Sequence, residues 1–303
     1  MTRAAHQSDS RLGVALVAGA AITWSTAGYF THLIHVSLFP MLVWRNFFGG
    51  LFMLGFLWWT ERGSTVHAVR SLGRVGWFVA VVNGMSMVCY LAALRHTSVA
   101  NVVVIYATAP FVAAGLAFLL YRDRATRRTL ATGVVALVGV AITVGGTPGA
   151  TGLLGDLLAG GMTLGVAIFT IVARRHRDRS MVAAAAMSAW VGILIALPFT
   201  SPSSLHVSPL QLAQLALFGV TSFGLGLILY TIGARHLHAA RSALISALDT
   251  PLAPLWVWLA FGLRPAIASV VGGGIVLAAV ITNILSERDP VPVLSADSVA
   301  ESV

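Results

Sequence analysis

The chain has 303 residues, of which 57% are hydrophobic and only 10% are charged. Soluble domains carry roughly 45–50% apolar and about 25% charged residues, so this composition excludes an ordinary water-soluble globular protein. The formal charge of +9 comes from 19 basic residues, all arginine, and these sit at the ends of apolar runs, which argues against nucleic-acid binding.

Ten apolar segments follow one another along the chain, each long enough or nearly long enough to cross a membrane. A helix needs about 20 residues to span the hydrocarbon core. The first segment exceeds the apolar core of a signal peptide, so we expect it to remain in the protein. We therefore predict an all-α integral membrane protein with ten transmembrane helices, at residues 12–33, 38–59, 75–94, 98–121, 128–146, 152–173, 181–199, 210–234, 239–262 and 266–285.

The arginines are distributed unequally between the two sides that these helices define. Sixteen of the 19 lie in the N-terminal segment, in the C-terminal tail or in the loops on the same side. The opposite side has Arg95 and Arg264, and Arg45 lies within a predicted helix. Because cytoplasmic loops are rich in arginine, we predict that both termini are cytoplasmic, and we expect a bacterial inner membrane.

Two parts of the chain resemble each other. Residues 90–96 (YLAALRH) align with 230–236 (YTIGARH), 140 residues later, and after one inserted residue 108–110 (TAP) align with 249–251 (DTP). These offsets divide ten helices into five plus five. Because five is odd, the second half begins on the opposite side of the membrane, so the halves form an inverted repeat around a pseudo-two-fold axis.

This repeat gives the predicted domain organisation. A cytoplasmic N-terminal segment at 1–11 precedes five-helix repeats at 12–146 and 147–285, and residues 286–303 form a disordered cytoplasmic tail. The tail contains prolines, serines and four acidic residues, and it has too little apolar surface to fold alone. Inverted repeats are typical of secondary transporters, because exchanging the conformations of the halves moves access from one side to the other.

A family resemblance rests on three stretches. They are AALRHTSVANVVVIYATAPFVAAGLAFLLYRD at 92–123, IGARHLHAARSALISALDTPLAPLWVWLAFGLRP at 232–265, and the early Trp24-Ser25. Together they resemble the drug/metabolite transporter superfamily, EamA type, and are most similar to the YddG-type amino-acid exporters. The resemblance spans about residues 12–285. It implies a secondary transporter that exports small organic metabolites, among them aromatic and apolar amino acids, through a midplane cavity by alternating access.

Three prolines fall inside predicted helices and more than two residues from their ends. Pro110 and Pro251 each deprive the carbonyl four residues earlier, on Tyr106 and Ala247, of its helical partner, and Pro254 adds a further position. They indicate either structural bends, which neighbouring hydroxyls satisfy, or paired hinges beside a substrate cavity. The two interpretations are compatible.

Two of the charged residues inside predicted helices suggest a polar site. Asp249 is the acid at mid-membrane depth, where a carboxylate usually faces a cavity or a partner, and it shares one helix face with Ser242 and Ser246. Arg45 enters from the outer face, about 10 Å along its helix. The pair suits a zwitterionic amino acid, but a structural salt bridge and interhelical hydrogen bonding are the alternatives.

Further polar and aromatic side chains extend the predicted substrate cavity. Asn83, Ser86 and Tyr90 share one face of the third predicted helix, and Tyr106 marks the fourth. Trp24 and Trp190 lie deep in the first and seventh helices, where indole rings can line a cavity with an apolar surface and a polar tip. Simple packing is the alternative for each of them.

Several functions lack their motifs. The sequence has no GxxxxGK[ST], no HExxH, no GxSxG and no second mid-membrane acid, so we expect a gradient-driven transporter and no enzyme. No histidine lies at a helix centre and the single cysteine is Cys89, so we expect no metal and no cofactor. The expected partners are a small-molecule substrate and membrane lipid. Drug efflux by proton antiport, a channel, and any oligomeric state remain open.

Overall fold

The computed structural model describes residues 3–61, 64–97, 99–144, 152–175 and 181–286, and in these ranges the chain is helical. The first helix begins at Arg3, inside the segment predicted to precede it, and the predicted tail lies outside the described residues except for Ser286. In chain order the helices are α1 (Arg3–Ser25), α2 (Ala27–Leu33), α3 (Leu38–Thr60), α4 (Thr65–Arg70), α5 (Gly73–His96), α6 (Val99–Tyr106), α7 (Ala109–Tyr121), α8 (Arg127–Val144), α9 (Leu153–Arg175), α10 (Met181–Ala196), η1 (Leu197–Phe199), η2 (Pro202–Leu205), α11 (Pro209–Phe218), η3 (Gly219–Leu225), α12 (Gly226–Ala234), α13 (Ala239–Ser246), α14 (Asp249–Phe261) and α15 (Ile267–Ser286).

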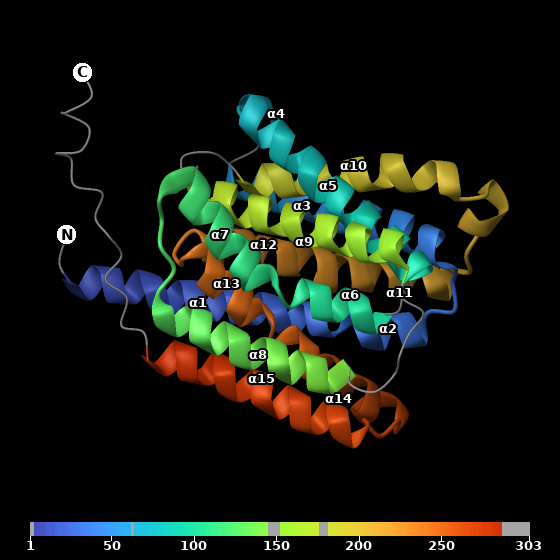
Figure 1. Ribbon diagram of the computed structural model, residues 1–303. Helices are drawn as coiled ribbons and strands as arrows, with labels where there is room; N and C mark the ends of the chain where they lie inside the picture. The colour runs from blue at the N-terminus through green and yellow to red at the C-terminus, as the bar shows by residue number, and fades with distance from the viewer. Residues whose placement is uncertain (1–2, 62–63, 98, 145–151, 176–180, 287–303) are drawn as a thin grey trace.

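Within the described residues, eight helical stretches are long and apolar enough to cross a membrane. They are α1–α2, α3, α6–α7, α9, α10–η1, α11–α12, α13–α14 and α15. The other two predicted spans correspond to α5 and α8, which are 24 and 18 residues long and lie alongside the rest (Figure 1). The all-helical membrane architecture is confirmed, and the count of ten spans stays a prediction.

Helices α6–α7 and α13–α14 are both interrupted, at positions that the repeat relates. α6 and α13 are each eight residues long, α7 and α14 are each thirteen, and every boundary recurs after 140 residues. Arg122 and Gly262, also 140 residues apart, end α7 and α14 in the left-handed conformation, with φ of 56° and 70°. The one-residue insertion that the sequence alignment needed is therefore absent from the structure.

The prolines explain why the alignment slipped by one residue. Pro110 is the second residue of α7, whereas Pro251 is the third residue of α14. The first four N–H groups of a helix have no partner within the helix, so proline is tolerated at either position. Both prolines therefore start a new helix at equivalent breaks, although they are not themselves equivalent. Pro254 lies inside α14.

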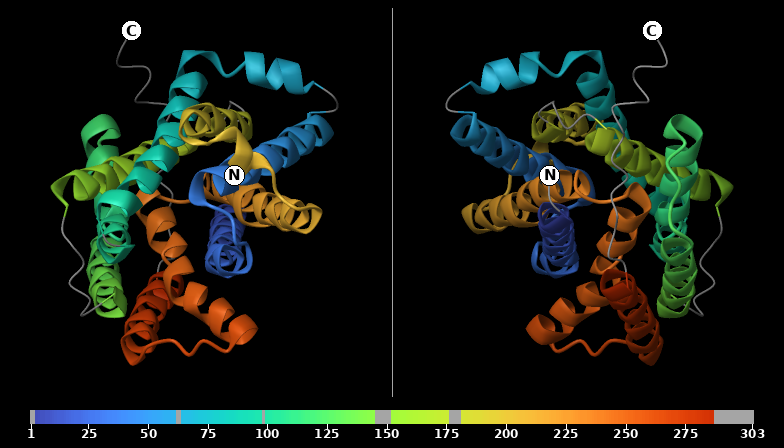
Figure 2. Two further views of the ribbon diagram at one scale, coloured as in Figure 1. Left: turned by 90° about the vertical axis from the view of Figure 1, so that its right-hand side faces the viewer. Right: turned by 90° about the vertical axis from the view of Figure 1, so that its left-hand side faces the viewer.

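The contacts between helices also correspond between the two halves of the chain (Figures 1 and 2). α9 packs against α5, α6 and α7, and α1 packs correspondingly against α12, α13 and α14. α3 packs against α10, and α8 packs against α15, each pair joining equivalent helices. We call α5, α6–α7 and α9 the first bundle, and α11–α12, α13–α14 and α1 the second bundle.

One end of the molecule is rich in arginine. At this end α1 begins and α7, α9 and α15 end (Figure 1, left), and it carries Arg122, Arg124, Arg174 and Arg175. The opposite end carries the connection from α14 to α15. We refer to the former as the arginine-rich end.

The contact between α8 and α15 depends on glycine. A Cβ atom at Gly272 would collide with the Gly139 carbonyl and the Thr143 amide, so the backbones would have to separate. We expect Gly272→Ala to destabilise the protein by about 1–3 kcal/mol, the usual cost of overpacking. Gly274→Ala, on the same helix, is the control because its Cβ meets nothing within 4 Å. Thermal unfolding in detergent checks this, and equal melting temperatures for both variants would contradict it.

Candidate functional site

A small cavity lies where the two helix breaks meet. Its lining consists largely of residues that the repeat relates, 140 positions apart. The lining residues are Val103, Tyr106, Ala107, Ala109, Pro110, Ala243, Ala247 and Thr250. Val103 is equivalent to Ala243, Ala107 to Ala247, and Pro110 to Thr250. The cavity therefore lies on the axis that relates the halves.

Tyr106, which lines the cavity, lies within electrostatic range of other hydroxyl groups. Tyr106 ends α6, Ser246 is its equivalent at the end of α13, and the two side chains interact with each other across the halves. Tyr106 also interacts electrostatically with Tyr90 of α5 and with Tyr230 of α12, a second pair of equivalents. The Tyr230 hydroxyl is hydrogen-bonded to Thr170 at 2.7 Å, and its side chain is buried.

Asp249 is the first residue of α14 and joins this group of hydroxyls. Thr250 Oγ1 donates to Asp249 Oδ1 at 3.1 Å, and the helix N-terminus favours a negative charge at this position. Within the described part of the chain, no arginine or histidine lies at ion-pair distance from its carboxylate. The structural salt bridge considered from the sequence is therefore not formed here.

Arg45 lies on α3 in the first half and is held by uncharged neighbours. Its Nη2 donates to Asn46 Oδ1 at 3.3 Å and lies 4.0 Å from the Met87 sulfur. The guanidinium carbon lies 5.5 Å from the centre of the Phe218 ring and 5.0 Å from that of Phe223. Its Nε is buried without a hydrogen-bond partner among the described residues. The arginine thus has an aromatic setting and, in the part of the chain that the structure describes, no counter-ion.

Tyr90 connects the two charges. Its hydroxyl interacts electrostatically with Arg45 and with Asp249. The side chain is 37% exposed although it faces charged groups on α3 and α14. The cation, the hydroxyl and the carboxylate of this group come from both halves of the chain.

The other residues predicted for the cavity lie in tighter packing. Asn83 and Ser86 are buried, and Asn83 Nδ2 donates to Ser188 Oγ of α10 at 2.8 Å, while Ser86 Oγ donates to the Val82 carbonyl. The Trp24 ring lies 5.0 Å from that of Tyr230. Trp190 lies edge-on to Phe47, with its indole N–H unpartnered among the described residues.

Sequence reasoning did not single out Tyr230 or the two rings beside Arg45, Phe218 and Phe223. For Tyr230 the signal was present, because it is equivalent to Tyr90 under the repeat. For Phe218 and Phe223 no such signal exists. Phe218 ends α11 and Phe223 lies in the π-helical segment η3, and both rings face Arg45. A π-helical segment does not follow the ordinary helical period, so the sequence pattern does not predict which side chains face each other there.

Burial changes sharply at the break in the ninth predicted helix. All eight residues of α13 are buried, whereas α14 contains no buried residue. α13 packs against α7 and α9 of the first bundle, while α14 packs against α1, α2 and α15. The two bundles are therefore in contact on the arginine-rich side of the cavity. On the other side of the cavity, α14 does not share this contact.

Comparison with known proteins agrees with this organisation. The sequence matches the EamA-like transporter family twice, over residues 11–145 and 153–285. Comparison with curated proteins gives no significant match. One crystal structure of a protein superposes with a TM-score of 0.77 at 17% identity, covering 91% of this chain and 97% of the other, which shows a common fold. The chain, a multi-pass membrane protein, belongs to the EamA-like transporter family of the drug/metabolite transporter superfamily.

Proposed function

We propose that this transporter exports amino acids, including aromatic and apolar ones, across a bacterial inner membrane, with both termini in the cytoplasm. The observation that carries the proposal is the pair formed by Arg45 and Asp249, which lack counter-ions in the described chain and both interact with Tyr90. A charged side chain inside a membrane protein costs free energy when it has no partner. The presence of two such side chains therefore favours a role in binding.

A zwitterion complements this arrangement. The guanidinium of Arg45 binds the substrate carboxylate and the carboxylate of Asp249 binds its ammonium group, with the Tyr90 hydroxyl within electrostatic range of both. The rings of Phe218 and Phe223 give the Arg45 guanidinium an apolar setting. We expect this setting to favour apolar amino acids over polar ones.

Transport follows from exchanging the conformations of the two halves. Ten membrane-spanning helices in two inverted sets of five would place the breaks before Pro110 and Pro251 at mid-membrane depth, where they act as hinges. With α13 packed against α7, the cavity is closed toward the cytoplasm, and α14, which packs against α1, α2 and α15 and not against the first bundle, leaves access from the outside. If the two halves exchanged these packing arrangements, the cavity would open toward the cytoplasm and close toward the outside.

Uptake of labelled solutes into liposomes containing the purified protein tests the proposal. The panel includes apolar and aromatic amino acids, their amides, and the matching amines and carboxylic acids, with and without a pH gradient. We expect saturable transport of the amino acids and little transport of analogues that lack one charged group. Transport of none of these compounds would overturn the proposal.

Drug efflux by proton antiport is the second candidate. Asp249, which has no basic partner in the described chain, is able to bind either a proton or an organic cation. In that case the amines would be transported, a pH gradient would drive them, and amino acids would not compete. The same panel therefore distinguishes the two candidates.

A further inference from the structure

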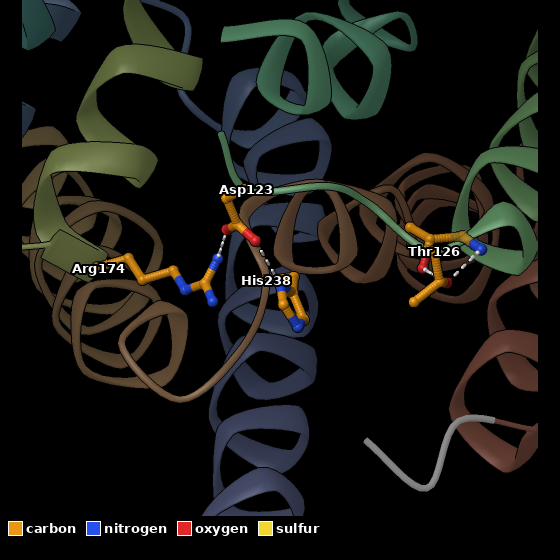
Figure 3. A network of polar contacts seen from close by, with 5 residues as sticks. Asp123, Thr126, Arg174 and His238 are labelled. Carbon is orange, nitrogen blue, oxygen red and sulfur yellow. Dashed lines mark hydrogen bonds and ion pairs between the residues drawn. The ribbon is translucent and has the colours of Figure 1, made fainter. Parts of the chain in front are cut away.

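A second polar cluster joins the two bundles at the arginine-rich end, away from the cavity (Figure 3). Asp123 follows α7, Arg174 lies in the last turn of α9, and His238 caps the start of α13. Arg174 Nη1 donates to Asp123 Oδ2, and His238 Nδ1 lies 3.5 Å from Asp123 Oδ1. One carboxylate thus contacts cationic or protonatable groups on both bundles.

The cluster lies over the apolar contact that closes this end. Ala113 and Ala117 of α7 belong to one buried group with Ala239 of α13 and with Ala167 and Ile171 of α9. Small side chains allow these helices to approach closely, as is common in membrane proteins. Polar interactions at the rim of such a contact add to its strength.

We propose that Asp123, Arg174 and His238 form a latch that holds the arginine-rich end of the transport pathway closed, and that opening to this side requires its release. This inference rests on the proposed alternating access and identifies where it is controlled. The three side chains are 26%, 18% and 14% exposed, respectively, so water can replace their mutual contacts when the bundles separate. Such a contact is reversible, unlike a fully buried ion pair.

The charge of the latch persists at neutral pH. The His238 side chain and the Arg174 guanidinium hold the pKa of Asp123 below its ordinary value, against an opposing effect of partial burial. A lowered carboxyl pKa stabilises the closed state at any pH above about 3.9, and this stabilisation is lost as pH falls through the lowered value. Arg122 and Arg124, the sequence neighbours of Asp123, instead lie over the Phe118 ring.

Spin-label distances at both ends test the latch without relying on transport. Cys89→Ala provides a cysteine-free background, in which Leu12→Cys and Leu120→Cys report on the arginine-rich end. A second doubly labelled variant, with Leu153→Cys and Leu263→Cys, reports on the opposite end. All four leucines are exposed, and each pair places one label near each bundle.

Neutralising the latch should shift the populations. For Asp123→Asn and Arg174→Gln we expect the ratio of closed to open molecules at the arginine-rich end to fall roughly fivefold or more, as expected for lost charge-assisted bonds. Arg175→Gln is the matched control, because its guanidinium stacks on Tyr121 next to the cluster. Unchanged distances in the latch variants, or an equal shift in the control, would overturn the proposal.

Charge reversal separates a latch from a requirement for folding. Arg174→Asp places two carboxylates together and should open this end further, whereas the double variant Asp123→Arg/Arg174→Asp should restore closure in part. His238→Ala removes the contact to α13 alone and should give an intermediate shift. No restoration in the double variant would contradict a latch. If distances respond as expected but no solute is transported, the proposed function fails while the latch stands.

Discussion

Replacing Asp249 by asparagine will reduce amino-acid transport by roughly tenfold to a hundredfold, the effect expected when a charge-assisted bond of about 1.5–3 kcal/mol is lost. The amide has nearly the same shape, and its oxygen can still accept the Thr250 hydroxyl that Asp249 Oδ1 accepts at 3.1 Å. The fold should therefore persist. Initial rates of uptake into liposomes, measured over a range of substrate concentrations, check this prediction.

Asp156→Asn is a suitable control for that variant. Asp156 is also a helical acid, but its Oδ1 accepts from Thr97 Oγ1 at 2.8 Å and from Asn101 Nδ2 at 3.4 Å, near the opposite end from the arginines. We expect its neutralisation to leave substrate affinity unchanged. If Asp249→Asn retains normal flux and affinity, Asp249 serves only to hold α14 in place.

The sequence predicted the parts of this fold that depend on period and composition. Apolar segments of membrane-spanning length placed every long helix, and the similarity of residues 90–96 to 230–236 located the repeat. The alignment placed Pro110 opposite Pro251, because proline is conspicuous in a sequence. The structure relates Pro110 to Thr250 instead, since helix breaks tolerate proline at several positions in the first turn.

The candidate site was predictable only in part, for a physical reason. Charge within an apolar segment is rare and costly, so Arg45 and Asp249 were conspicuous in the sequence. Serine and asparagine are ambiguous, because they also join helices, and Asn83 makes such a contact with Ser188. The latch residues Asp123 and Arg174 lie 51 positions apart in loops and helix ends, and no periodicity relates them.

Replacing Arg45 by glutamine will change which solutes the transporter accepts. We expect amino-acid uptake to fall roughly tenfold or more, because the substrate carboxylate loses its charge-assisted partner. Amines and amino-acid amides, which have no carboxylate, should be affected little and should compete better against amino acids than they do in the wild type. Competition uptake with matched amine and amino-acid pairs measures this change in selectivity.

Arg45→Lys distinguishes charge from shape. Lysine keeps the positive charge but loses the planar fork that binds a carboxylate at two points and that stacks near Phe218 and Phe223. Its transport should be intermediate between those of the wild type and Arg45→Gln. Arg264→Gln is the control, since this exposed arginine lies beyond the end of α14, whereas Thr250 of the cavity lies at the start of that helix.

Arg45→Met separates a role in binding from a role in stability. A structural arginine would stabilise the fold through a partner, and its loss would lower the melting temperature. Arg45 has no acidic partner in the described chain, and its Nε is unpaired, so its burial costs free energy. We therefore expect Arg45→Met to raise the free energy of unfolding by about 1–2 kcal/mol while amino-acid transport is lost, because substitutions at functional sites often raise stability at the cost of function. A lower melting temperature together with retained transport would show that Arg45 is a packing residue, and a binding site for a zwitterion would then lack its anion-binding pole.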